Sequence, residues 1–117
     1  MKVAIIGSRG LFVSDFSPYL PQGVTEIVSG GARGIDSCAR EYAKKHNLKL
    51  TEFLPQYNKY PGKSAPHKRN DQIIEYADIV LAFWDGQSRG TQSVIKKCKE
   101  RGKKVIILLE RKETPDN

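Results

Sequence analysis

The sequence predicts a single α/β domain with a Rossmann-like, three-layer fold, in which about five parallel strands carry helices on both faces. Short apolar runs alternate with segments of helical periodicity along the 117 residues, and this alternation is typical of βαβ crossovers. Three of the apolar runs are continuous, as in strands that are covered on both faces. A chain of this length forms one core of ordinary size. We expect the strand order 3-2-1-4-5.

The strands are expected where apolar and β-branched residues run together between turn residues. Five such runs are residues 3–6, 26–28, 48–53, 78–84 and 104–109. We therefore assign residues 1–109 to one ligand-binding domain and the polar residues 110–117 to a frayed C-terminal tail.

The helices are expected where apolar residues recur at three- and four-residue spacing. This spacing predicts helices at residues 35–47, 69–77 and 91–101. A weaker pattern, interrupted by proline, predicts a short helix at residues 13–20.

Composition narrows the class of partner. Lys and Arg number 20 and Asp and Glu number 13, so the net charge of +7 favours anionic partners such as phosphates, nucleotides or nucleic acid. No apolar run is long enough to span a membrane, and the first apolar stretch is too short for a signal peptide. Cys38 and Cys98 lie far apart without metal-ligand spacing. We expect a cytoplasmic protein with no membrane partner and no metal.

Three loops that follow predicted strands are rich in Gly, Ser and Arg, at residues 7–10, 29–36 and 85–91. In open parallel sheets, ligands bind beyond the carboxyl ends of the strands, where the strand order reverses. Gly allows close approach of a ligand, helix N-termini hold phosphate, and Arg adds a bidentate donor. The loops therefore predict a phosphate-binding cleft, although a single loop of this kind is also compatible with an ordinary βα turn.

A long connection at residues 54–68 combines aromatic residues with cations and has no acidic residue. Tyr57 and Tyr60 could stack on a base while Lys59, Lys63 and His67 contact phosphates; the alternative is a solvated basic loop.

Two carboxylates lie at the predicted cleft. Asp36 could complement the dipole of its helix, or accept hydrogen bonds from a ribose or from loop N–H groups. Asp85 is well placed for function, because it heads the third Gly-rich loop.

Four motifs, IIGSRG, SGGARGID, GKSAPHKRN and AFWDGQSRGT, together resemble the SLOG superfamily, and they span nearly all of residues 2–109. The chain is most similar to the small stand-alone branch labelled YspA or cpYpsA-related, and SGGARGID also resembles the larger relative DprA/Smf. The resemblance implies a Rossmann-like fold and a pocket for nucleotides or nucleotide-derived ligands. It also implies a homo-oligomer, since related folds assemble as dimers or larger.

The ligand-binding candidates combine the pocket positions that the resemblance implies with Arg33 and Arg89 of the Gly-rich loops. They are Gly7, Ser8, Arg9, Ser29, Gly30, Gly31, Arg33, Gly34, Asp36, Lys63, Arg69, Asn70, Asp85, Ser88, Arg89, Gly90 and Thr91. The catalytic candidates, if there is turnover, are Asp36, Arg69 and Asp85.

One departure from the family bears on activity. Hydrolases of the related LOG type resemble PGGxGTxxE, with a catalytic Glu three residues after the Thr, whereas this chain has Val94 at that position. Valine cannot act as a general base or stabilise a developing cation. We therefore expect a nucleotide-binding sensor or carrier that requires no cofactor. The alternatives are a nucleotide-processing hydrolase that uses Asp36 or Asp85, and a DprA-like protein that binds single-stranded nucleic acid.

Overall fold

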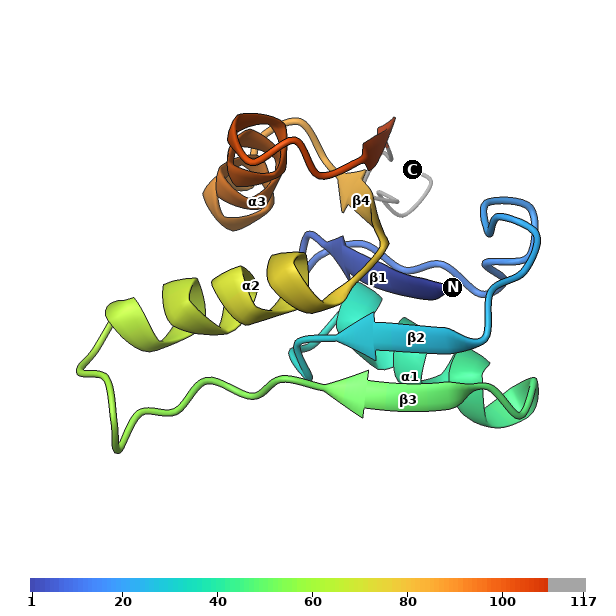
Figure 1. The fold of residues 1–117 in the computed structure, drawn as a ribbon, viewed down its shortest axis with the longest axis horizontal. Coiled ribbons are helices and arrows are strands. Elements are labelled where there is room, and N and C mark those ends of the chain that lie inside the picture. Colours follow the sequence, from blue (N-terminus) through green and yellow to red (C-terminus); the bar gives the residue numbers. More distant parts are fainter. Residues whose placement is uncertain (110–117) are drawn as a thin grey trace, which may run out of the picture.

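The computed structural model describes residues 1–109, which fold around one parallel sheet of five strands in the order β3-β2-β1-β4-β5. The strands are β1 (Lys2–Gly7), β2 (Glu26–Ser29), β3 (Lys49–Glu52), β4 (Ile79–Trp84) and β5 (Val105–Leu109). Figure 1 shows the arrowheads of β1, β2 and β3 pointing to the same side. The predicted order and the parallel arrangement are confirmed. Residues 110–117, expected to be a tail, lie outside the described residues.

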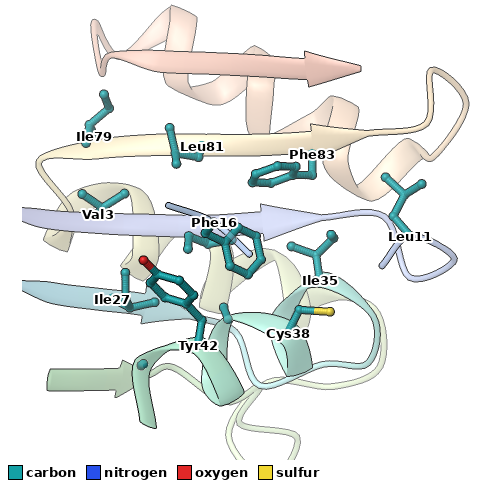
Figure 2. Close-up of a cluster of buried hydrophobic side chains, with 13 residues drawn as sticks. Val3, Leu11, Phe16, Ile27, Ile35, Cys38, Tyr42, Ile79, Leu81 and Phe83 are labelled. Atoms are coloured by element: carbon teal, nitrogen blue, oxygen red, sulfur yellow. The ribbon is translucent and has the colours of Figure 1, made fainter. Parts of the chain in front are cut away.

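Helices cover both faces of the sheet, as the alternating pattern predicts. Helix α1 (Ile35–Lys45) packs on one face, where a buried cluster joins it to β1, β2 and β4 (Figure 2). Helices α2 (Ser64–Tyr76) and α3 (Arg89–Glu100) cover the opposite face through Ile73, Ile74, Val94 and Ile95. The successive residues of β1 alternate between the two clusters, because side chains of a strand point to opposite faces.

The predicted helix at residues 13–20 is wrong: this segment forms a loop with a single turn. The Asp15 side chain accepts a hydrogen bond from the Ser17 N–H (3.0 Å), which offers the backbone an alternative to helical bonding. The segment instead delivers Phe16, which is fully buried edge-on against Phe83 and Tyr42 at centroid distances of 5.3 and 5.6 Å (Figure 2). It covers the part of the sheet that α1 leaves open.

Helix α2 begins at Ser64, five residues before the predicted start, so the connection after β3 is shorter than expected. Pro66 lies in the first turn, where a missing N–H and a fixed φ are compatible with a helix. Because of this early start, Arg69 and Asn70 lie in the second turn of α2 and not at its first residues.

The amino end of the sheet contains a buried carboxylate with several partners. Glu26 Oε2 accepts hydrogen bonds from the Thr51 hydroxyl (2.7 Å) and the Tyr76 hydroxyl (2.6 Å), and Oε1 lies 3.6 Å from Lys49 Nζ. These contacts join β2, β3 and the last turn of α2, so this end of the molecule is fixed by protein groups alone.

Two cations near the C-terminal end of α3 form ion pairs with α2. Asp71 Oδ1 of α2 forms ion pairs with Lys97 Nζ (3.0 Å) and Arg101 Nη2 (2.9 Å). Lys97 and Arg101 thus hold α3 against α2, and this contact helps to set the separation of the two helices that border the cleft described below.

Candidate anion-binding cleft

A small cleft lies at the carboxyl end of the sheet, where the order reverses between β1 and β4. Its volume is about 80 Å³, and an adjoining hollow of about 210 Å³ shares Arg9, Gly30, Ala32 and Arg69 with it. The candidates brought together at the cleft are Gly7, Arg9, Gly30, Asp36, Arg69, Asn70, Gly90 and Thr91. Gly31 lines the adjoining hollow.

The first Gly-rich loop is held against the second by backbone packing. A Cβ on Gly7 would lie 2.6 Å from Cγ1 of Ile35 and 2.7 Å from the Phe83 carbonyl oxygen. Gly34 has φ 75° and packs directly against the backbone of Arg9. These two glycines therefore allow close packing between β1, β4 and α1, and they fix the backbone from which the exposed Arg9 side chain reaches the cleft.

Arg69 supplies the buried positive charge of the cleft. Arg69 is only 9% exposed. Its Nη1 donates a hydrogen bond to the Gly30 carbonyl (2.5 Å), and its Nε donates one to Asn70 Oδ1 (2.8 Å). Within residues 1–109, Nη2 donates to no protein atom, so that edge of the guanidinium is available to a ligand. Burial lowers the pKa of Arg69, and the negative charge of Asp36 opposes the shift; an arginine with a lowered pKa still carries its charge at neutral pH.

Asp36 is the one carboxylate that lines the cleft among the described residues. It is 7% exposed, and its Oδ2 accepts a hydrogen bond from the Ala32 N–H (3.0 Å). Burial raises the pKa of Asp36, and this outweighs the Ala32 N–H and the charge of Arg69, which lower it. A side chain on Gly30 would collide with both groups, since its Cβ would lie 2.5 Å from Arg69 Nη1 and 3.1 Å from Asp36 Oδ2.

Two helix N-termini border the cleft. No side chain caps α1, whereas at α3 the Ser88 hydroxyl accepts a hydrogen bond from the Thr91 N–H (3.4 Å). Gly90 has nothing within 4 Å of the position that a Cβ would take, so the first turn of α3 presents bare backbone to the cleft. Free N–H groups and the positive ends of two helix dipoles favour an anion at this place.

Part of the cleft lining is apolar, and of its residues the sequence singled out Val94 alone. Ile6, Ile73 and Val94 form it, each also part of the core that α2 and α3 share with the sheet. Val94, the position of the Glu that the LOG resemblance implies, thus faces the cleft. In the sequence Ile6 and Ile73 are indistinguishable from other core positions, because the same periodic patterns that mark buried residues include them.

The other predicted ligand residues do not line the cleft or the adjoining hollow. Ser8 and Ser29 are buried; their hydroxyls accept hydrogen bonds from the N–H groups of Asp85 and Gly31, each at 3.3 Å, and so support the loops. Asp85 Oδ1 accepts the N–H groups of Gln87 and Ser88 and shapes the turn before α3. The exposed residues are Arg33, Lys63 and Arg89.

The connection after β3 meets the cleft at one point. Tyr57, which is 62% exposed, lines the adjoining hollow together with Pro55 and Pro66. Lys59 and Lys68 lie instead over the ring of Tyr60, at 5.5 and 5.8 Å from its centroid. Of the two tyrosines expected to stack on a base, Tyr57 is therefore the one beside the cleft, and His67 is exposed on α2.

Residues 1–109 hold no cluster of three His, Cys, Asp or Glu side chains that could bind a metal ion. No helix among these residues is long and apolar enough to cross a membrane.

Comparison with known proteins gives two matches. The family model for DNA recombination-mediator protein A matches residues 1–88. The Gene 61 protein of Mycobacterium phage D29 is 33% identical over 85 residues, which are 68% of this chain and 68% of the phage protein. No solved structure is significantly similar to the chain.

Proposed function

This chain belongs to the family of DNA recombination-mediator protein A, and we propose that its cleft binds the phosphate group of a nucleotide or nucleotide-derived ligand. The observation that carries the proposal is Arg69, a buried guanidinium whose free edge borders a cleft between two helix N-termini. The protein would act as a sensor or carrier, without turnover.

The charges around the cleft favour an anion. Arg9 and Arg69 line it, and the N-termini of α1 and α3 add their partial positive charges. Asp36 opposes an anion only when it is ionised. Its raised pKa makes protonation easier, and a protonated carboxyl would donate a hydrogen bond to a phosphate oxygen.

The two spaces also suit the parts of a nucleotide. The cleft of about 80 Å³ is a few times the ~30 Å³ that one water occupies in the liquid, a size compatible with a phosphate group but not with a whole nucleotide. The adjoining hollow of about 210 Å³, with the exposed ring of Tyr57 at its side, is compatible with the sugar and part of the base.

Gly90→Ala gives the sharpest test, because it adds a methyl group to the cleft at a helical position where the protein itself leaves room. We expect the free energy of unfolding to rise by about 0.5–1 kcal/mol, since Ala is the better helix former. The affinity for AMP, measured by calorimetry on the full chain, should fall at least about tenfold if phosphate contacts this backbone.

Gln92→Ala is the matched control, since Gln92 lies on the same helix but lines a different groove. It should leave the affinity for AMP unchanged. Arg69→Ala should abolish binding, although it also removes hydrogen bonds from the fold. If Gly90→Ala is more stable and still binds AMP like the original protein, or if a panel of AMP, ADP-ribose, NAD and cyclic nucleotides gives no thermal shift, the proposal is wrong.

A second candidate function is binding of single-stranded nucleic acid, which the family favours. Lys59, Lys63 and Lys68 lie on or next to the connection after β3, and all three are exposed. Oligothymidylates of increasing length would separate the two functions. For a strand, affinity should grow with length and fall with salt, with a slope of about −0.7 per phosphate contacted. For a mononucleotide site, added length should have no effect.

Hydrolysis of a nucleotide remains the third hypothesis, with Asp36 as its acid or base, because a buried carboxyl of raised pKa is suited to that role. The apolar side chain of Val94 in the cleft argues against the mechanism of the LOG hydrolases. Release of free base from AMP over hours, lost in Asp36→Asn, would support an enzyme. Release that persists in this variant would exclude Asp36 from the role.

A further inference from the structure

The two edges of the sheet differ in how they face solvent. The edge strand β3 carries polar side chains held in ion pairs, Glu52 with Arg40 at 2.9 Å and Lys49 with Glu26 at 3.6 Å. The edge strand β5 has the sequence VIILL, and its Ile106 and Ile107 are 36% and 37% exposed. Charges at an edge oppose pairing with another chain, whereas an apolar edge permits it.

The backbone of β5 is also open on its outer side within the described residues. β5 pairs with β4 alone, and the Val80 N–H donates to the Lys104 carbonyl (3.0 Å). Since backbone groups alternate in direction along a strand, this register turns the N–H and C=O groups of Val105 and Ile107 away from β4. These groups are able to pair with one further strand.

A groove of about 800 Å³ runs between this edge and α3, apart from the anion-binding cleft. Trp84, Ile95 and Ile107 give it an apolar floor, and the Trp84 Nε1–H is already used by the Ser88 carbonyl (3.0 Å). Cations surround the floor: Arg89, Lys96 and Lys99 line the groove with a single acidic residue, Glu100, which lies 3.9 Å from Lys96.

We propose that the β5 edge and this groove bind an extended segment of a partner protein, in which apolar and acidic side chains take turns at every second position and so share the face toward α3. The segment would add a strand to β5 through the backbone groups of Val105 and Ile107. Its apolar side chains would pack on Ile107 and Trp84, and its carboxylates would meet Lys96 and Lys99. This surface is separate from the proposed nucleotide function and does not depend on it.

The chemistry of the groove favours a peptide over nucleic acid. Two of the three floor residues are aliphatic and offer no ring for a base to stack on, and the indole N–H has no free hydrogen to donate. The open backbone of β5 has the spacing of a strand, which a peptide matches and a sugar-phosphate chain does not.

The test uses a fluorescein-labelled eight-residue peptide, Val-Thr-Glu-Thr-Val-Thr-Glu-Thr (the Glu-Val peptide), in which Val and Glu share one face of a strand. Binding to the full chain is followed by anisotropy. Ile107→Pro removes the outward N–H, and Lys96→Glu/Lys99→Glu reverses the charges of the groove. We expect each to weaken binding at least about tenfold, and a peptide with Lys in place of Glu to bind at least about tenfold more weakly. The charge variant changes only exposed side chains, so it keeps the test valid if Ile107→Pro does not fold.

Lys44→Glu/Lys45→Glu is the matched control, with the same change of net charge at exposed positions of α1. It should leave peptide binding unchanged. The proposal is overturned if the Glu-Val peptide does not bind, if the control weakens binding equally, or if oligothymidylate competes for the same groove. A dimer in solution that Ile107→Pro separates would also overturn it, because the occupant would then be a second copy of this chain.

Discussion

Glu26 and Asp36 are equally exposed to solvent, at 7% each, but lie at opposite ends of the sheet and show opposite shifts of pKa. Burial raises the pKa of Glu26, yet the hydroxyls of Tyr76 and Thr51, together with Lys49, outweigh it and bring the pKa below its ordinary value. Burial likewise raises the pKa of Asp36, and there the Ala32 N–H and Arg69 are not enough to reverse the shift.

The difference separates a carboxylate that the protein itself satisfies from one that faces the proposed ligand site. The protein satisfies Glu26 with groups from two other elements, β3 and α2, so this side chain contributes to stability as an anion. Asp36 has one backbone donor and faces the cleft, so its ionised form is disfavoured in the free protein. The two carboxylates differ in the partners that the protein gives them, and Asp36 also lies deeper, so burial has a larger effect on its pKa.

Removal of Glu26 should have the largest effect. In Glu26→Ala, two charged hydrogen bonds are lost and the Tyr76 and Thr51 hydroxyls lose their acceptor, so we expect the free energy of unfolding to fall by about 3 kcal/mol. Urea denaturation measures this change. Glu41→Ala, at an exposed position of α1, is the control and should change stability by less than about 0.5 kcal/mol. Equal losses in both variants would refute the structural role.

Removal of one donor to Glu26 should have about half that effect. Tyr76→Phe deletes the hydrogen bond of 2.6 Å but keeps the ring contacts with Phe53 and Lys2. We expect a loss of about 1.5 kcal/mol at pH 7, measured by thermal or urea unfolding. The loss should shrink as pH falls below the ordinary pKa of 4.5, where Glu26 becomes protonated. A loss that is independent of pH would indicate packing, not the carboxylate, as its cause.

Neutralising Asp36 should have a smaller effect of the opposite sign. A carboxyl whose folded pKa is raised lowers the free energy of unfolding as the pH rises above its ordinary pKa of 3.8, and the loss is complete above the folded pKa, so Asp36→Asn should gain about 1 kcal/mol or less at pH 7. Below the ordinary pKa of 3.8 the two proteins should be equally stable. Urea denaturation of both proteins across pH 3–8 measures where their stabilities begin to differ. Asn keeps an acceptor for the Ala32 N–H, so a marked loss at pH 7 would place Asp36 with Glu26 among the structural carboxylates.

Removal of the exposed partner of Glu26 should have the smallest effect. The Lys49 side chain is 69% exposed and its Nζ lies 3.6 Å from Oε1. We expect Lys49→Ala to lower the free energy of unfolding by about 0.3 kcal/mol, and less at high salt, because water and ions screen the pair. Urea denaturation at low and high salt tests this. A loss comparable with that of Tyr76→Phe would mean that the ion pair, and not the hydrogen bonds, keeps Glu26 ionised.

The sheet could be predicted from the sequence because its determinants are local. Continuous apolar runs mark its central strands, and helical periodicity marks the three helices. The motif resemblance to DprA-related SLOG proteins is confirmed by the family match. The predicted helix at residues 13–20 failed because the hydrogen bond from Ser17 to Asp15 and the tertiary packing of Phe16 outweigh a weak periodic pattern.

The cleft was predicted in place but not in detail. The Gly-rich loops indicated its place, because glycines are needed where backbones pack closely, as at Gly7 and Gly34. Which cations enter it depends on the rotation and start of each helix, so Arg69 faces the cleft while Arg89, one residue before Gly90, lines the groove beside α3. The partners of Glu26 are 25 and 50 residues away, and no local pattern reports such distant contacts.

The central position of β1 has a consequence for synthesis of the protein. The first strand lies between β2 and β4, and the Lys2 N–H donates to Asp78 Oδ2 (2.7 Å) across 76 residues of chain. A chain emerging from the ribosome can join β1 to β2 and β3 early, but the other flank of β1 stays bare until β4 emerges. The cleft needs Thr91 and Val94 of α3 as well as Arg9, so a truncated translation product that ends before α3 carries the first two Gly-rich loops but no complete cleft.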